Sequence, residues 1–320
     1  EISIIYEVPS IIEEIGGVVV SSKTFGDIIR KLPDIYVTIE TSSEGKSLII
    51  NSGNAHFEIT YMDKSGYPKV SLIDTDDSLS ISQSNLKNLI RQTSFAASQE
   101  NTRPILKGVL VENRNSLLNF VALDGYRLAI KNIESTFDKE FKMVVSARVL
   151  NELSKIIEDS DEFIYINYDD SRIMFYNSNF KMISRLLQGD FIDYTRMLPK
   201  EHKTIIDINR KELLSAVERV ALVLEDDKKK PIVIKNYDDE IVINVAGERG
   251  VSREVVSAEI TGDEMELFFS SRHIFECLRA IDESNVKIVL TGPFHPVIIK
   301  SDEDKSYTFL VMPVRQPGTR

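Results

Sequence analysis

One short pattern of apolar residues, serine and a basic residue occurs three times in this chain. It stands at residues 20–25, 145–150 and 269–274, so successive copies are roughly 125 residues apart. A repeat of that length is the size of a domain and is far longer than the unit of a solenoid. The sequence therefore predicts three copies of one fold.

Each copy predicts a helix followed by three strands. The apolar residues after the serine recur at the spacing of an amphipathic helix, and the serine can accept hydrogen bonds from the first turn. Three runs rich in β-branched and aromatic residues follow, separated by turn residues, as in antiparallel hairpins. The predicted helices cover 23–32, 148–158 and 272–281, and the predicted strands cover 36–40, 48–51, 57–61, 163–168, 173–176, 180–187, 286–290, 297–300 and 307–311.

Weaker copies of the same unit lie between the strong ones. The strand-like run 79–82 leads into a predicted helix at 84–94, and the run 206–209 leads into another at 210–221. Each domain thus contains two half-units, and three such domains require one helix more than the five predicted. We expect this missing half-unit to precede residue 1. The sequence predicts an α+β protein whose domains cover 1–76 (the C-terminal part of the first domain), 77–202 and 203–320.

The composition limits the classes of function. The net charge of −11 argues against a protein that grips nucleic acid over its whole surface, although it allows a local basic face. The single cysteine, Cys277, cannot form an intramolecular disulfide and favours a reducing compartment. No apolar run reaches about 18 residues, so the sequence predicts no membrane-spanning helix.

No set of residues indicates catalysis. The four histidines lack metal-ligand spacing, and the chain contains neither a phosphate-binding glycine loop nor a serine nucleophile elbow. Acidic pairs at 169–170 and 238–239 fall in predicted turns, where solvated carboxylates are usual, although a catalytic carboxylate pair stays an open alternative. We therefore expect a protein that is not an enzyme and that uses no cofactor and no metal.

Three longer motifs carry a resemblance to a known family. They are Thr-Arg-Pro-Ile-Leu-Lys-Gly at 102–108, Asp-Gly-Tyr-Arg-Leu-Ala at 124–129 and Val-Met-Pro-Val-Arg at 311–315. In this order and spacing they resemble the hallmarks of the bacterial DNA polymerase III β subunits, the sliding clamps. The resemblance covers the entire chain. It departs from the family pattern in the expected loss of the first half-unit and in residues 316–320, which extend past the usual end.

The resemblance implies a DNA-clamp fold and a function without chemistry. Two chains of three domains join head to tail into a ring, in which helices line the hole and a continuous sheet lies outside. This homodimer encircles double-stranded DNA without regard to base sequence and tethers the replicative polymerase, so it acts as a processivity factor in the bacterial cytoplasm, at the nucleoid. Clamp loader and repair proteins bind the same ring through short peptides that contain leucine and an aromatic residue.

Basic residues on the predicted helices agree with such a channel. Lys23, Arg148 and Arg272 occupy one equivalent position in the three strong repeats. A basic inner wall in an acidic chain attracts phosphates at long range and lets DNA slide. The alternative is that these side chains only solvate exposed helix faces. The residues expected to face DNA are Lys23, Lys87, Arg91, Arg103, Arg148, Arg210 and Arg272.

The resemblance also implies a peptide cleft between the second and third domains. Arg127 and Arg315 are expected to bind peptide carbonyls or acidic groups there. Leu123, Phe294 and Pro296 differ from the residues usual in the family, so peptide preference is expected to differ in detail. The implied cleft residues are Leu106, Leu123, Gly125, Tyr126, Arg127, Leu128, Pro199, His273, Phe294, Pro296, Leu310, Val311, Met312, Pro313, Val314 and Arg315.

For the joint between two chains, the resemblance implies that Phe57 of one chain meets Leu222 and Val223 of the other. The alternation of its strand makes Phe57 equally suitable as a core residue. Two other functions stay open. One is a metal-free hydrolase or transferase, for which the chain offers no catalytic set; the other is an interaction scaffold of the same fold that does not encircle DNA.

Overall fold

The computed structural model describes residues 2–33, 36–42, 45–74, 78–199, 201–224, 230–247 and 249–315. The chain divides into two compact units, Glu7–Leu72 and a larger unit that combines Glu1–Tyr6 with Ile73–Arg320. The expected domain boundary near residue 76 and the chain end at 316–320 lie outside the described residues.

The smaller unit contains the first predicted helix and its three strands. Helix α1 (Ser22–Ile29) begins after Ser21, whose side chain accepts a hydrogen bond from the Thr24 N–H at 3.4 Å. Strands β2 (Thr38–Ser42), β3 (Ser47–Ser52) and β4 (Ala55–Thr60) form an antiparallel sheet in the order β2-β3-β4. This order of elements confirms the prediction, although the first strand begins two residues later than expected.

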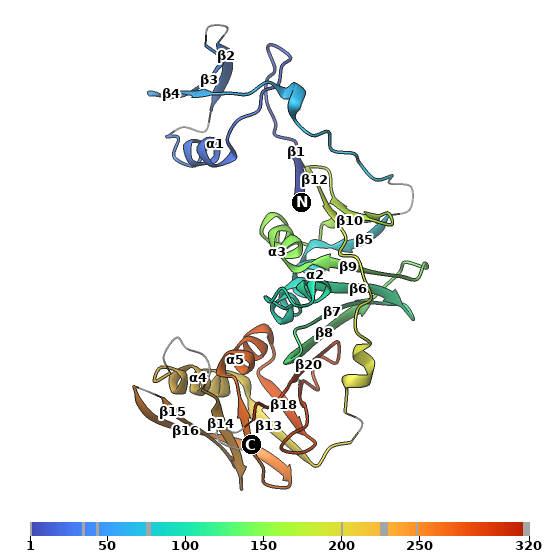
Figure 1. Cartoon of the computed structure of the whole chain (residues 1–320), viewed down its shortest axis with the longest axis vertical. Coiled ribbons are helices and arrows are strands. Elements are labelled where there is room, and N and C mark those ends of the chain that lie inside the picture. Colours follow the sequence, from blue (N-terminus) through green and yellow to red (C-terminus); the bar gives the residue numbers. More distant parts are fainter. Residues whose placement is uncertain are drawn as a thin grey trace. The chain divides into compact units, whose positions relative to one another are not determined.

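The larger unit contains the second and third repeats, which share one order of elements: strand, helix, four strands, helix, three strands (Figure 1). The second comprises β5 (Leu79–Ser82), α2 (Gln83–Arg91), β6 (Gly108–Arg114), β7 (Leu117–Leu123), β8 (Arg127–Glu134), β9 (Phe141–Ser146), α3 (Ala147–Ile156), β10 (Phe163–Tyr168), β11 (Arg172–Tyr176) and β12 (Phe180–Arg185). The third comprises β13 (Thr204–Asn209), α4 (Arg210–Ala221), β14 (Ile232–Tyr237), β15 (Glu240–Gly247), β16 (Gly250–Gly262), β17 (Glu266–Phe269), α5 (Ser271–Ala280), β18 (Asn285–Leu290), β19 (Val297–Lys300) and β20 (Tyr307–Val311). The shared order confirms the two half-units per domain.

Strand pairing joins the second and third repeats into one sheet. Among the described residues its order is β17-β14-β15-β16-β13-β18-β19-β20-β8-β7-β6-β9. The joint is the antiparallel pair β20–β8, in which Val311 lies opposite Arg127. A second sheet has the order β1-β12-β11-β10-β5, so β1 (Ile2–Tyr6) pairs with the last strand of the second repeat.

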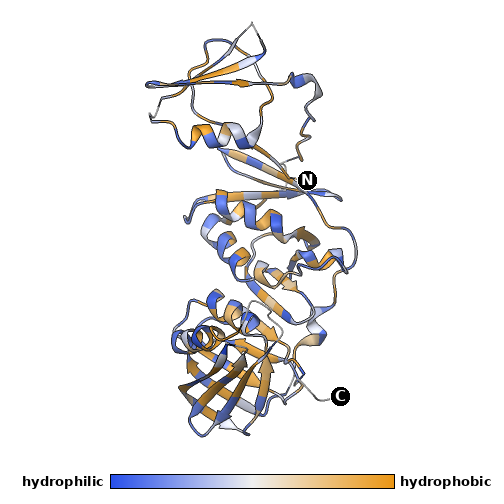
Figure 2. Cartoon of the chain, turned by 60° about the vertical axis from the view of Figure 1, so that its left-hand side comes forward, coloured by the Kyte–Doolittle hydropathy of each residue, from blue (hydrophilic) through white to orange (hydrophobic). Residues whose placement is uncertain are grey.

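The helices lie in pairs against these sheets: α2 packs beside α3, and α4 packs beside α5 (Figure 1). Helix α3 shows why, because it buries Val149, Leu150 and Leu153 while Arg148 and Asn151 stay exposed. Figure 2 shows the same alternation of hydrophilic and hydrophobic residues along the helices. Each fully buried leucine contributes about 1.5–3 kcal/mol, so the apolar faces hold the helices on the sheet.

Three short 3-10 helices complete the surroundings of the site: η2 (Ser94–Ala96), η3 (Pro104–Lys107) and η4 (Tyr194–Met197). Within the described ranges, no helix is long and apolar enough to cross a membrane.

Candidate functional site

The Asp124–Arg127 turn joins β7 to β8 beside the joint of the two repeats. Asp124 Oδ1 accepts hydrogen bonds from the backbone N–H groups of Tyr126 (2.9 Å) and Arg127 (3.0 Å), which closes the turn. Gly125 has a φ of 92°, a left-handed conformation that favours glycine. The turn leaves the Tyr126 side chain exposed and directs Arg127 and Leu128 inward.

Arg127 is buried, with only 4% of its surface exposed. Its Nε donates to Asp124 Oδ2 at 3.1 Å, Nη2 donates to the Phe95 carbonyl at 2.6 Å, and Nη1 donates to the Glu276 carboxylate. The guanidinium also lies over the Phe95 ring, 5.3 Å from its centroid. Each nitrogen of the Arg127 guanidinium thus has a partner inside the protein, and the expected contact of Arg127 with a peptide stays a prediction.

An apolar cluster gathers many of the predicted cleft residues. Leu106, Leu123, Leu128 and Leu310 are buried in it, and the half-buried Met312 packs against them. This cluster is separate from the main core. Val311, by contrast, belongs to the main core, so the strand end at 310–312 contributes to both. The structure therefore brings together residues from three sequence motifs.

The connection between the second and third repeats forms a further wall of this cluster. Its members there are Leu187, Phe191, Ile192, Tyr194, Met197 and Leu198, and Pro199 follows directly. The Tyr194 hydroxyl donates to Glu112 Oε1 at 2.6 Å, which anchors the wall on β6; burial and this carboxylate raise the pKa of Tyr194. Apart from Pro199, these residues were not predicted from the sequence, although the apolar pairs 191–192 and 197–198 in a turn-rich segment were available as an indication.

The C-terminal motif runs between the turn and the third repeat. The Met312 N–H donates to the Tyr126 carbonyl at 2.7 Å, and the Val314 N–H donates to the Phe268 carbonyl at 2.7 Å. Met312, Pro313 and Val314 are half-buried, whereas Arg315 is exposed. Backbone pairing thus holds the motif beside the apolar cluster and leaves the Arg315 side chain in solvent.

Three aromatic or imidazole side chains lie toward the outside. The rings of Tyr126 and His273 are 5.9 Å apart. Burial, followed by the nearby Arg127 charge, holds the pKa of His273 below its usual 6.5. Phe294, on the β18–β19 connection beside the half-buried Pro296, is 79% exposed and is not a member of the apolar cluster. Tyr126 and Phe294 are thus accessible to a partner.

The basic residues differ in their environment. Lys23, Arg148 and Arg272 are each the second residue of their helix, in α1, α3 and α5, and all three are exposed. Arg103 is exposed just before η3. These four side chains are positioned where an anion could reach them.

Arg210 is a correction, because it is buried and points into the protein. Its Nε donates to the Glu283 carbonyl at 2.9 Å and Nη1 donates to the Leu278 carbonyl at 3.4 Å, so it stabilises the end of α5. Lys87 similarly donates to the Ile157 carbonyl at 3.2 Å. These two side chains serve the packing of the helix pairs.

Arg91 joins the second and third repeats. It donates to the Ala280 carbonyl at 3.0 Å and to Asn88 Oδ1 at 2.7 Å, and it pairs with Asp282. Its side chain nonetheless stays partly exposed. Arg91 is therefore primarily a joint residue.

The residues expected at the joint between chains are accessible. Phe57 is 36% exposed and Leu222 is 74% exposed, while Val223 is half-buried. Phe57 is thus not a fully buried core residue, and its place at an interface between chains stays a prediction. Phe57 lies on β4, which has only β3 as a neighbour among the described strands.

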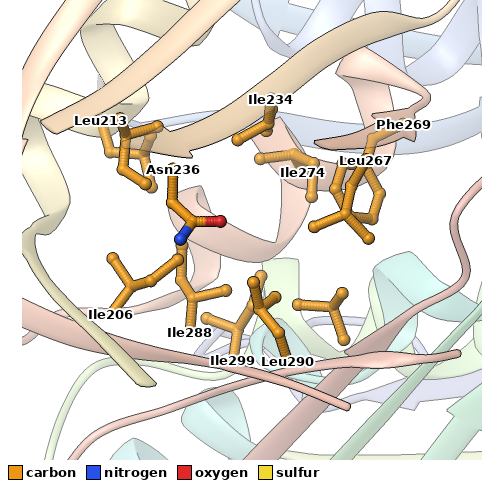
Figure 3. Close-up of a pocket in the computed structure, with 12 residues that line it drawn as sticks. Ile206, Leu213, Ile234, Asn236, Leu267, Phe269, Ile274, Ile288, Leu290 and Ile299 are labelled. Atoms are coloured by element: carbon orange, nitrogen blue, oxygen red, sulfur yellow. The ribbon is translucent and has the colours of Figure 1, made fainter. Parts of the chain in front are cut away.

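An enclosed space inside the third repeat offers no binding site. It measures about 20 Å³, room for no more than a single water molecule. Figure 3 shows its aliphatic lining around Asn236. That amide donates to the Asp263 carbonyl and accepts from the Met265 N–H, so its polar atoms are satisfied. Across the described ranges, no group of three or more His, Cys, Asp or Glu side chains could hold a metal ion.

Comparison with known proteins covers nearly the whole chain. Family models of the DNA polymerase III beta subunit match residues 1–71 (N-terminal domain), 80–193 (central domain) and 195–315 (C-terminal domain). The beta sliding clamp of Staphylococcus epidermidis is 33% identical over 307 residues, which are 95% of this chain and 81% of that protein. The clamp of Bacillus subtilis is 32% identical over 309 residues.

A solved structure agrees with these relatives. The DNA polymerase sliding clamp from Bacillus subtilis superposes with a TM-score of 0.90 at 31% identity, covering 98% of this chain and 86% of that one. The chain belongs to the DNA polymerase III beta subunit family, the bacterial sliding clamps.

Proposed function

We propose that this chain is a DNA polymerase processivity factor that encircles duplex DNA as a ring-shaped homodimer and carries out no catalysis. The observation that supports this most is the match of three clamp domains, in order, along the chain. The protein acts in the bacterial cytoplasm, at the nucleoid, where it tethers the replicative polymerase to its template.

Charge distribution supports sliding on DNA. The exposed Lys23, Arg148 and Arg272 stand at equivalent helix starts in a chain of net charge −11. Such residues attract phosphates without reading bases. We include the exposed Arg103 and the partly exposed Lys87 and Arg91 as weaker contributors, and we exclude the buried Arg210.

Internal symmetry supports a head-to-tail dimer. Within one chain, the third strand after the second helix of the third repeat (β20) pairs with β8 of the second repeat. By element order, β4 corresponds to β20 and β16 corresponds to β8. Residues 250–257 of β16 pair only with β15 among the described strands, so this edge and that of β4 are both available. Pairing β4 of one copy with β16 of another repeats the β20–β8 joint and covers Phe57, Leu222 and Val223.

The apolar cluster supports binding of short peptides. We propose that a leucine and an aromatic residue from polymerase, clamp loader or repair proteins enter between Met312 and the 187–199 connection. The exposed Tyr126 and Phe294 contact the aromatic residue, and Arg315 meets acidic groups at the rim. Adaptable aliphatic and Met side chains suit a cleft with several partners.

A fluorescence-polarisation titration tests the cleft. The probe is a fluorescein-labelled peptide with leucine followed by an aromatic residue, and the variants are Met312→Ala and, as a matched control, the exposed Met62→Ala. Saturable binding that only Met312→Ala weakens supports the proposal. No binding by the folded wild-type chain contradicts it.

Encirclement is tested by comparing retention of the protein on nicked circular DNA with retention on the same DNA after linearisation. A closed protein ring can slide off the end of linear DNA but cannot leave a circle. Equal loss from both forms contradicts a topological clamp and favours an interaction scaffold of the same fold.

A further inference from the structure

Glu276 holds two arginines at the joint between the second and third repeats. Its carboxylate accepts from Arg127 Nη1 and, at 2.9 Å, from Arg272 Nε. Its side chain is 25% exposed, whereas that of Arg127 is almost fully covered. Burial alone raises the pKa of Glu276, but the hydrogen bonds from the two arginines outweigh it and lower that pKa. The carboxylate is therefore a charged, hydrogen-bonded part of the joint.

A series of hydrogen bonds connects Glu276 with Met312 through Arg127, Asp124 and the backbone of Tyr126. Arg127 bonds Asp124, and Asp124 closes the turn by accepting the Tyr126 N–H. The Tyr126 carbonyl then accepts the Met312 N–H at 2.7 Å. The position of Met312 thus depends on a turn that Glu276 stabilises from the opposite repeat.

We propose that Glu276 is the positioning residue of the peptide cleft. It fixes the Arg127 guanidinium away from the peptide and, through it, the Asp124–Tyr126 turn and Met312. One carboxylate then determines the geometry of both the peptide cleft and the joint between the repeats. This inference rests on the proposed function of the cleft in peptide binding.

A second ion pair at the same joint provides a matched control. Lys131 on β8 bonds Asp304 at 2.6 Å and Ser306 at 2.6 Å, both in or beside the β19–β20 connection. The Lys131–Asp304 pair joins the same two repeats, and the Lys131 side chain is about as deeply buried as that of Arg127. None of these three residues belongs to the apolar cluster of the cleft. Removing the Lys131–Asp304 pair is therefore expected to weaken the joint between the repeats without moving the Asp124–Arg127 turn.

The experiment compares Glu276→Gln with Asp304→Asn in the full chain. Peptide affinity is measured with the fluorescein-labelled leucine–aromatic peptide, and stability is measured by thermal unfolding. Both variants are expected to unfold at lower temperature. Glu276→Gln is expected to weaken the peptide about tenfold, as loss of hydrogen bonds to a charged group does, while Asp304→Asn stays within about twofold of wild type. Wild-type affinity in folded Glu276→Gln, or equal weakening in Asp304→Asn, overturns the proposal.

A double variant keeps the test decisive if the single change prevents folding. Replacing both partners, Arg127→Met with Glu276→Met, removes both charges of this ion pair together, and such paired replacements often retain stability. Asp124 loses its contact with the guanidinium but keeps the backbone N–H groups of residues 126 and 127 as hydrogen-bond donors. We expect this variant to fold but to bind the peptide about tenfold more weakly. Wild-type affinity in the double variant contradicts a positioning role. A wild-type chain that does not bind the peptide contradicts the proposed function itself.

Discussion

The guanidinium of Arg127 in β8 donates a hydrogen bond to the carboxylate of Glu276 in α5, across the joint of two domains. A buried guanidinium needs a counter-charge and hydrogen-bond acceptors, because its desolvation is otherwise very unfavourable. Asp124, Glu276 and the Phe95 carbonyl supply them. Arg127 is consequently a structural residue of the joint between the second and third repeats, beside the proposed peptide cleft.

Replacing Arg127 with Ala is expected to destabilise the larger unit by about 3–5 kcal/mol, since it leaves Glu276 and Asp124 without their buried partner. Denaturant unfolding of the full chain measures this. Arg148→Ala, at an exposed position, is the control and is expected to change the free energy of unfolding by less than about 0.5 kcal/mol. Equal stability of the two variants would show that the buried network contributes nothing.

Met312→Ala is expected to leave the fold intact and to weaken peptide binding about tenfold or more, because truncation removes apolar contact area at a central position. The half-buried side chain explains why the stability cost is modest. Peptide titration and thermal unfolding of the same sample separate the two effects. A lowered affinity that merely follows the fraction of unfolded protein would contradict a direct contact.

Arg148→Ala and Lys23→Ala, made together, are expected to weaken DNA retention and to reduce the slope of log affinity against log salt by about one for each phosphate that is no longer neutralised. Peptide binding is expected to stay unchanged. Lys300→Ala on β19, an exposed cation outside the helices, is the control. An equal effect of Lys300→Ala would indicate non-specific attraction.

Phe57→Asp and Leu222→Asp are each expected to shift the protein from dimer to monomer, because a carboxylate would be buried where apolar side chains meet. Sedimentation velocity measures the proportions of dimer and monomer directly. Phe163→Asp, an exposed aromatic residue on β10, controls for loss of surface hydrophobicity. A dimer that survives both interface changes would contradict the β4–β16 pairing.

The joint between the second and third repeats is expected to weaken in acid. Because burial and Arg127 hold the pKa of His273 below 6.5 in the folded state, protonation favours unfolding; its contribution is present above about pH 6.5 and is lost as the pH falls. Arg127, Asp124, Glu276 and Arg272 are the charged groups around the imidazole. The lowered pKa of Glu276 acts in the same direction, with its contribution lost only below about pH 4.5.

His273→Asn is expected to flatten the fall in unfolding temperature between about pH 7 and pH 5. The exposed His202→Asn is the control. Identical pH profiles of His273→Asn and the wild type would exclude His273 as the titrating group.

Local sequence determined the elements of this protein. Helix starts at Ser21 and Asn209 follow from side chains that accept the first N–H groups, and the amphipathic spacing sets the buried face. Those interactions lie within a turn or two, so the five predicted helices match α1 to α5 closely. The family resemblance also identified Leu106, Leu123, Leu128 and Met312, which the structure brings into one cluster.

Only the tertiary structure decided which partners each charged or apolar side chain has at this site. The sequence could not show that Arg127 meets Glu276, 149 residues away, or that Arg210 turns inward to the Leu278 carbonyl of α5. The apolar residues between 187 and 198 were missed for the same reason, because this segment has no periodicity of its own and forms an apolar wall only by packing with residues of β6 and β8. Burial and pairing are set by residues far apart in the chain, and local patterns do not specify which distant group will satisfy a charge.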